Sequence, residues 1–327
     1  MRVFSGIRAS GEKTLGNYSG GFRQYAATQE QGDAFFCIVD LHSITTAYES
    51  PEFRGATLSL AAMLFATGLD AERSTVFAQS HVSAHAEAAW LLSSVTSFGE
   101  LRRMTQFKEK SADQDFVSAG LFNYPVLMAG DILLYLADIV PVGDDQRQHI
   151  ELARNIAERF NQRYGETFVV PQGVFPDEGA RIKNLQEPER LMSTSAGAPQ
   201  GVVRMTDPPE VIRKKFKTAV TDSRRDIVHD PEKPGISNLI EIMAVATGDA
   251  ISQIEQHYDG QGYGPFKDDV ADAVIALLGP IQERYRELRS DDDRLHHLLA
   301  VGAEKARAAS APTLARMYEV MGFVTRD

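Results

Sequence analysis

The chain has 327 residues, of which 43% are hydrophobic and 24% are charged, an ordinary balance for a globular protein. This length accommodates two packed units, because domains commonly run about 100 to 200 residues. The net charge of -11 excludes a general nucleic-acid coat, which would need a broad excess of Lys and Arg over phosphates.

Targeting, membrane and metal signals are absent from the sequence pattern. The opening residues lack a basic segment followed by a long apolar run, and no later stretch has the roughly 18 consecutive apolar residues of a membrane span. We therefore expect a cytoplasmic protein with no membrane partner. The single cysteine, Cys37, lies in an apolar run and is predicted to be a buried strand residue. One cysteine and eight scattered histidines show no ligand spacing, so no metal site is expected.

The first predicted elements are a short buried strand, a loop with glycines at 6 and 11, and a helix that opens around Thr14 to Asn17. Such a loop leaves backbone N–H groups facing an anion, with the positive end of the helix dipole behind it. Gly16 lacks a Cβ, so a flat base or ribose could lie directly on the helix backbone. Taken alone, the same loop is more typical of an ordinary capped turn.

Apolar strands then alternate with amphipathic helices. Strands are predicted at 35–39 and 75–78, and helices at 53–69 and 84–95. That order favours an α/β fold of the Rossmann-like type, with a parallel sheet covered on both faces. A further strand at 139–142 ends at a glycine and leads into a long helix, and such a junction is where open α/β sheets place ligands.

A lone carboxylate marks the segment at 128–135. If this segment is helical, Met128, Asp131, Ile132 and Tyr135 share one face. A buried carboxylate must find a donor, because an unpaired buried charge is expensive. By itself, Asp131 is most simply interpreted as a member of an ion pair or as a helix cap.

After about residue 186 the pattern changes to helices interrupted by prolines, which predicts a smaller helical domain. An apolar stripe at 270–281 has the spacing of one buried helix face. The stretch at 294–321 again favours a helix. The densest basic stretch, at 213–225, is either a solvated helix face or a local RNA surface.

Several segments together resemble the class I aminoacyl-tRNA synthetases, in the form found in the bacterial tryptophan enzymes. Thr-Leu-Gly-Asn at 14–17 is similar to the His-Ile-Gly-His signature of that family. Further segments similar to the family follow in the expected order at 36–42, 99–111, 124–135, 140–146, 219–223 and 234–239. One glycine loop would be weak support, whereas an ordered set along nearly the whole chain is specific.

The resemblance implies a division of the chain and an activity. It implies a Rossmann-like catalytic domain at 1–186, a signature loop and helical anticodon-binding domain at 187–293, and a C-terminal helix at 294–327 that packs back on the catalytic domain. The implied reaction activates L-tryptophan with ATP and then transfers it to tRNA(Trp). The implied enzyme is a homodimer that takes ATP with Mg²⁺ and has no tightly bound cofactor, and helix 84–95 could form the dimer interface.

The resemblance also assigns residues. It implies that ATP is contacted by Arg8, Ala9, Ser10, Thr14, Gly16, Asn17, Gly143, Asp144, Asp145, Ile182, Leu191, Met192, Ser193, Thr194 and Ser195. It implies that tryptophan is contacted by Phe4, His42, Tyr124, Met128, Asp131, Ile132, Val140, Val142 and Gln146, with His42, Tyr124 and Gln146 on the ammonium or carboxylate. The implied catalytic residues are Lys110, Ser193 and Ser195. An N-capping role for Asp144 is compatible with this assignment and is favoured over a direct contact with the ribose.

The resemblance gives Asp131 a specific role. Indole offers one N–H donor and no acceptor, which suits a carboxylate and which phenylalanine lacks. A site that relies on this bond discriminates by on the order of 10⁴-fold, because the rival leaves a polar group unpaired.

One segment departs from the family pattern. The second signature, normally Lys-Met-Ser-Lys-Ser, is Leu-Met-Ser-Thr-Ser at 191–195. A hydroxyl donates a hydrogen bond but brings no positive charge to the leaving pyrophosphate, and the loss of one such group typically costs about 10² to 10³ in rate. Arg8, where relatives usually carry Gln, would restore charge, and Lys183 or Arg190 could swing into the vacancy. Three readings stay open: a working synthetase, a slowly activating tryptophan-binding paralogue, and a non-catalytic binding module.

Overall fold

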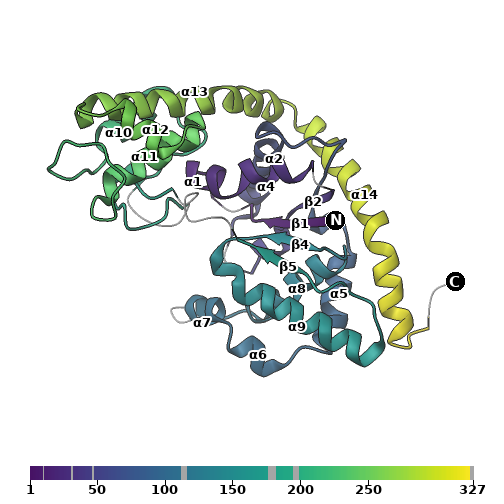
Figure 1. Ribbon diagram of the computed structural model, residues 1–327. Helices are drawn as coiled ribbons and strands as arrows, with labels where there is room; N and C mark the ends of the chain where they lie inside the picture. The colour runs from purple at the N-terminus through teal and green to yellow at the C-terminus, as the bar shows by residue number, and fades with distance from the viewer. Residues whose placement is uncertain are drawn as a thin grey trace.

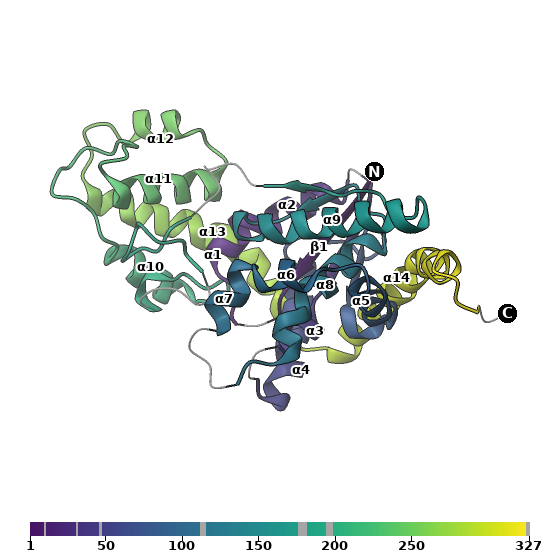
Figure 2. The ribbon, with the colours of Figure 1, turned by 90° about the horizontal axis from the view of Figure 1, so that it is seen from below.

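The computed structural model describes residues 1–9, 11–30, 32–45, 48–111, 116–175, 182–193 and 199–324. Figure 1 shows two lobes, one built on a sheet and one built only of helices, with a long C-terminal helix that returns from the helical lobe to the sheet lobe. The orthogonal view in Figure 2 keeps the two lobes apart in the same way. No helix in these ranges is both long enough and apolar enough to cross a bilayer.

The sheet has five parallel strands in the order β3-β2-β1-β4-β5. The strands are β1 Arg2–Ile7, β2 Asp33–Ile38, β3 Thr75–Ala78, β4 Ile139–Pro141 and β5 Gln172–Val174. The predicted parallel α/β fold is confirmed, and β3 has the predicted bounds. Strand β5 was not predicted, because its three residues include no apolar run and are mostly solvent-facing.

Helices surround the sheet and form the second lobe. In the sheet lobe they are α1 Leu15–Asn17, α2 Arg23–Thr28, α3 Asp40–Ser43, α4 Ser50–Ala66, α5 Ala84–Ser93, α6 Phe98–Arg102, α7 Thr105–Ser111, α8 Ala119–Leu133 and α9 Arg147–Tyr164. In the helical lobe they are α10 Pro209–Lys217, α11 Pro234–Thr247, α12 Ile251–His257 and α13 Tyr263–Arg289, followed by α14 Asp292–Val320.

Two hydrophobic cores lie on opposite faces of the sheet, because successive strand residues point to opposite sides. Phe36 and Ile38 of β2 enter the core that contains α4, whereas Phe35 and Cys37 enter the core that contains α5, α8 and α9. The α4 core continues into the helical lobe, where the predicted stripe of α13 is buried or half-buried. Cys37 is fully buried as predicted, and burial, followed by the charges of Asp131 and Asp40, raises the pKa of its thiol.

Helix α14 packs along β3, the edge strand of the sheet. Its backbone comes so close to the strand that a Cβ on Gly302 would overlap the carbonyl oxygen of Val76. Only glycine permits this approach at position 302. The helix therefore covers the edge of the sheet at that strand, and it begins two residues before the predicted 294.

Candidate active site

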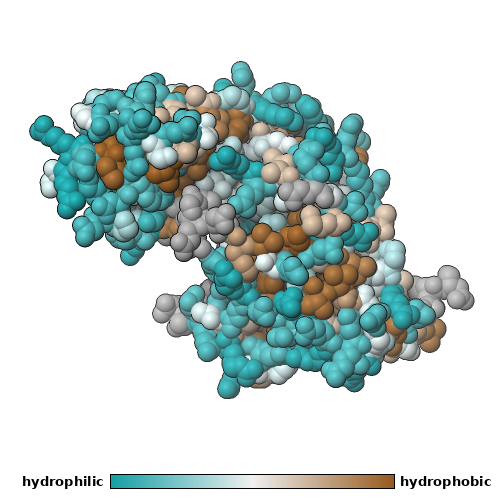
Figure 3. Space-filling view, viewed as in Figure 1, coloured by the Kyte–Doolittle hydropathy of each residue, from teal (hydrophilic) through white to brown (hydrophobic). Residues whose placement is uncertain are grey.

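Two adjoining pockets open where β1 and β4 end. The Asp131 pocket, about 540 Å³, is lined by Phe4, Gly6, Arg8, Tyr25, Val39, His42, Gln106, Glu109, Tyr124, Met128, Asp131, Ile132, Val140, Pro141, Val142, Gly143, Asp145 and Gln146. The Gly16 pocket, about 600 Å³, is lined by Gly6, Ile7, Arg8, Lys13, Gly16, Asn17, Gly20, Gly21, Phe22, Tyr25, Gly143, Asp144, Asp145, Ile182, Leu191, Met192 and Ser193. Five shared residues, Gly6, Arg8, Tyr25, Gly143 and Asp145, join them. Figure 3 shows this face hollowed between the lobes, with hydrophobic residues gathered on the sheet lobe.

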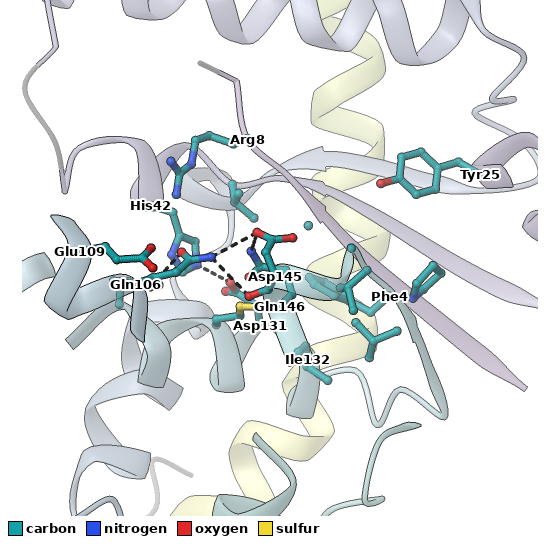
Figure 4. A pocket seen from close by; sticks show the side chains of 18 residues that line it. Phe4, Arg8, Tyr25, His42, Gln106, Glu109, Asp131, Ile132, Asp145 and Gln146 are labelled. Carbon is teal, nitrogen blue, oxygen red and sulfur yellow. Dashed lines mark hydrogen bonds and ion pairs between the residues drawn. The ribbon is translucent and has the colours of Figure 1, made fainter. Parts of the chain in front are cut away.

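The Asp131 pocket contains every residue predicted for the amino acid. Its apolar walls come from β1, α8 and β4, namely Phe4, Met128, Ile132, Val140 and Val142. Figure 4 shows Asp131 and His42 close together on one side of this pocket, with Gln146 and Asp145 beside them. A largely apolar pocket with a few convergent polar groups is the usual form of a small-molecule site.

Three side chains donate hydrogen bonds to Asp131. Its Oδ1 accepts from Gln79 Nε2 at 2.7 Å and from His85 Nδ1 at 2.6 Å, and its Oδ2 accepts from His42 Nε2 at 2.7 Å. The Tyr135 hydroxyl lies 2.9 Å from His85 Nε2 and donates to it when Nδ1 carries the proton. The three donors lie on α3, on the 3-10 turn at 79–81 and on α5. Together they hold the Asp131 carboxylate in one position.

The surroundings decide the charge of this carboxyl group. Asp131 is 1% exposed, and burial alone would raise its pKa. The hydrogen bonds from His42 and His85 outweigh burial and hold the pKa of Asp131 below its ordinary value. Burial raises the pKa of the Tyr135 hydroxyl, which remains a donor. The pocket therefore presents a fixed anion among apolar side chains.

His42 has a different main contact from the one the resemblance implied. It is 6% exposed, and its Nε2 is engaged with Asp131. The Tyr124 ring lies edge-on to that of His42, with 6.1 Å between the ring centroids. The Tyr124 hydroxyl is 2.8 Å from His149 Nε2, and burial raises the pKa of Tyr124 to about 12. Gln146 Nε2 donates to Asp145 Oδ2. His42 thus supports the carboxylate, while Tyr124 and Gln146 line the same pocket without contacting Asp131 in the hydrogen bonds described.

Most of the predicted ATP residues line the Gly16 pocket, but not all. Ala9 and Thr14 are buried outside its lining. Ser10, Thr194 and Ser195 lie outside the described residues, and the side chain of Lys110 is likewise not described.

Gly16 has a role that was not predicted. A Cβ at this position would overlap the backbone carbonyl of Met192. Thr14, the N-cap of α1, donates from its hydroxyl to the same carbonyl oxygen at 3.2 Å. The start of the second signature, at 191–193, therefore lies on the Cβ side of Gly16, and contact of ATP with this glycine, which lines the pocket, stays a prediction. The glycine permits that segment to dock on α1.

The N-capping role expected for Asp144 is wrong. Gly143 is the N-cap of the short 3-10 turn at Asp144–Gln146, and no side chain caps α9. The Asp144 carboxylate instead accepts from the Arg147 guanidinium at 2.7 Å and 3.0 Å. Asp144 therefore lines the Gly16 pocket as one member of an exposed ion pair.

Sequence reasoning missed several site residues. Gln79 and His85 follow β3. The carboxyl end of β3 lies at the same edge of the predicted sheet as the site, but no site residue was predicted there. Lys13 and Tyr25 were likewise not identified, and both line the Gly16 pocket. Lys13 had a signal, because it directly precedes the predicted helix start.

The fold and the paired pockets define an α/β enzyme that holds a nucleotide at its strand ends beside an apolar pocket for a second small substrate. The family described as tRNA synthetases class I (W and Y) matches residues 1–279, and the chain belongs to it. The protein is therefore an aminoacyl-tRNA synthetase.

Individual relatives cover nearly the whole chain. The chain is 48% identical to the tryptophan–tRNA ligase of Clostridium acetobutylicum over 324 residues. This match covers 98% of this chain and 97% of the relative. The crystal structure of tryptophanyl-tRNA synthetase from Mycoplasma pneumoniae is 34% identical with a TM-score of 0.90, covering 99% of this chain and 98% of that one. The enzyme from Campylobacter jejuni, complexed with ADP and tryptophan, is 33% identical with a TM-score of 0.86, covering 99% and 100%.

Proposed function

We propose that this synthetase is a tryptophan–tRNA ligase that works in the cytoplasm. It activates L-tryptophan with ATP and transfers the amino acid to tRNA(Trp). The observation that carries the choice of amino acid is Asp131, an anion fixed by three donors in an otherwise apolar pocket. The names of the similar proteins agree with this choice.

Tryptophan is recognised through its indole N–H. An ionised carboxylate has about four acceptor positions, and the described residues use two on Oδ1 and one on Oδ2 of Asp131. The remaining position on Oδ2 accepts the indole N–H, while the apolar walls take the ring. Tyr124 and Gln146, which line the same pocket, hold the ammonium and carboxylate of the amino acid.

ATP occupies the Gly16 pocket and enters as its Mg²⁺ complex. The ribose lies against the turn at 143–145, which both pockets share in part. This places the α-phosphate at the junction with the Asp131 pocket. The Campylobacter jejuni enzyme, in a complex with ADP and tryptophan, binds both kinds of ligand.

Exchange of pyrophosphate into ATP tests this function. The purified protein is expected to catalyse the exchange with tryptophan and not with tyrosine or phenylalanine, and then to charge bacterial tRNA in the same tube. Exchange without charging would favour the slowly activating paralogue, for which the exposed Leu191 in place of a cation is the specific observation. Absence of both activities would contradict the synthetase assignment and leave a binding module.

We also propose that the helical lobe at 187–293 contacts the tRNA and that the enzyme is a homodimer. Trp90 on α5 is 78% exposed and Phe98 on α6 is 67% exposed, and Phe98 contacts Phe122 of α8 at 5.0 Å between ring centroids. Large exposed aromatic residues on neighbouring helices are typical of a protein interface. A second copy of the chain is the proposed partner of this aromatic surface.

Trp90→Glu is expected to dissociate the dimer, because the change places a charge in an apolar interface. Loss of one aromatic anchor typically weakens an interface by about 30-fold or more. Sedimentation at decreasing protein concentration measures the shift. Phe323→Glu, which alters an aromatic residue that is 50% exposed beyond α14, is the matched control and should leave the dimer intact. Equal sedimentation of the two variants would contradict the proposed interface.

A further inference from the structure

The charges around the Gly16 pocket are unevenly placed. Among the described residues that line it, the cations are Arg8 and Lys13, both on the loop that follows β1. The acids are Asp144 and Asp145, and Asp144 already accepts from Arg147. A triphosphate carries several negative charges, so the loop after β1 is the part of the described lining that can balance them.

The backbone fixes Lys13 at this position. Met205 N donates to the Lys13 carbonyl at 2.9 Å, and Leu15 N donates to Val203 O at 2.9 Å. The ammonium of Lys13 donates to the Arg8 carbonyl at 2.7 Å, so the two cationic residues are linked through one hydrogen bond. Lys13 is half-buried. Lys13 therefore lies on an anchored loop and lines both the Gly16 pocket and a smaller one beside it.

The electrostatic surroundings of Lys13 favour an anion. Burial, and then the positive charge of Arg8, lowers the pKa of the Lys13 ammonium to about 8. Both causes disfavour the charged form of the ammonium. A phosphate beside the ammonium would offset both effects, because opposite charges within a few ångströms favour the charged forms.

Position 191 lies in the same pocket without a charge. Leu191 is 53% exposed there, and its backbone pairs with that of Lys183. Neither Lys183 nor Arg190 lines the pocket, and Arg190 pairs with Glu187 at 3.3 Å. The signature segment, as far as it is described, therefore brings no cation to the nucleotide.

We propose that Lys13, together with Arg8, holds the triphosphate and stabilises the leaving pyrophosphate, a task moved from the signature segment to the loop after β1. This inference rests on the proposed function. In the reaction a tryptophan carboxylate oxygen bonds to the α-phosphorus, and the bond from that phosphorus to the bridging oxygen of the β-phosphate breaks. The electron pair leaves with pyrophosphate, and no proton or redox change is needed. Lys13 is thus a catalytic residue that faces the charge as it develops.

Lys13→Met tests the role of the cation in ATP–pyrophosphate exchange with tryptophan. We expect kcat to fall about 10²- to 10³-fold and the KM for ATP to rise, with the KM for tryptophan unchanged. Lys13→Arg keeps the charge and should retain most of the rate. Lys305→Met removes an exposed lysine from α14 and is the matched control. Thermal unfolding of each variant separates loss of charge from loss of fold.

Leu191→Lys tests whether the charge has moved. In the Lys13→Met background this change should restore the rate at least about tenfold, whereas in the unaltered protein it should change the rate less than about twofold. Equal effects in both backgrounds would overturn the inference, as would a folded Lys13→Met variant within twofold of the unaltered protein. No exchange by the unaltered protein would instead overturn the proposed function. ATP affinity, measured by calorimetry, still tests the cation in that case, because unchanged affinity in Lys13→Met would overturn it too.

Discussion

Asp131→Ala is expected to lower kcat/KM for tryptophan in ATP–pyrophosphate exchange by about 10³-fold or more, with ATP affinity nearly unchanged. The variant removes the acceptor of the indole N–H, and a site built around such a bond loses discrimination of about 10⁴-fold without it. The Gly16 pocket does not include Asp131, so ATP binding should be spared. Initial rates at varied tryptophan and varied ATP separate the two effects.

Stability has to be controlled in this experiment, because His42 and His85 lose their shared acceptor in Asp131→Ala. Breaking such a buried set by removing one partner typically costs about 3 to 5 kcal/mol. Asp131→Asn keeps the shape of the side chain and should be more stable than Asp131→Ala. The amide of Asn removes the negative charge of the carboxylate. Asp33→Ala, an exposed carboxylate at the start of β2, is the control for loss of an acidic group. Unchanged tryptophan activation in a folded Asp131→Asn variant would remove the recognition argument.

An analogue with sulfur in place of the indole N–H gives an independent measure. The unaltered protein should prefer tryptophan to this analogue by a large factor, because the sulfur donates no hydrogen bond to Asp131. In Asp131→Ala the preference should shrink toward unity. A general structural defect would lower both rates together and leave their ratio unchanged.

Gly16→Ala is the second change with a large expected effect. The added methyl group would overlap the Met192 carbonyl oxygen, which is backbone and cannot rotate away. The signature segment must then shift from α1, and the hydrogen bond from Thr14 to Met192 breaks. Overpacking of this kind typically costs about 1 to 3 kcal/mol. We expect adenylate formation to fall at least about 100-fold, because the segment no longer closes the nucleotide pocket.

Gly20→Ala is the matched control, because Gly20 lines the same pocket and a Cβ there would meet nothing within 4 Å. Thermal unfolding without ATP distinguishes the two explanations of Gly16. A lower melting temperature in Gly16→Ala without nucleotide supports a docking role for the glycine. An unchanged melting temperature together with a higher KM for ATP would support the earlier expectation of a base lying on the helix.

The sheet was predictable because burial on both faces leaves continuous apolar runs, as in β2. Its fifth strand was not, since pairing with β4 rather than its own composition makes 172–174 a strand. The same limit applies to the site. Tertiary structure brings Gln79 and His85 to Asp131 across 52 and 46 residues, and no local pattern encodes those contacts. The apolar walls were predictable, because they lie at the ends of predicted strands and on one face of a predicted helix.

The cover that α14 gives to β3 has a consequence during translation. The strand emerges from the ribosome roughly 200 residues before the helix that protects its edge. At about 5 to 20 residues per second, the nascent sheet has an uncovered edge for on the order of ten to forty seconds. An open strand edge is a template for pairing with other chains. Crowded polysomes are therefore where this protein most needs a chaperone. A nonsense codon between residue 193 and α14 yields an aggregation-prone product that still has all of its pocket residues.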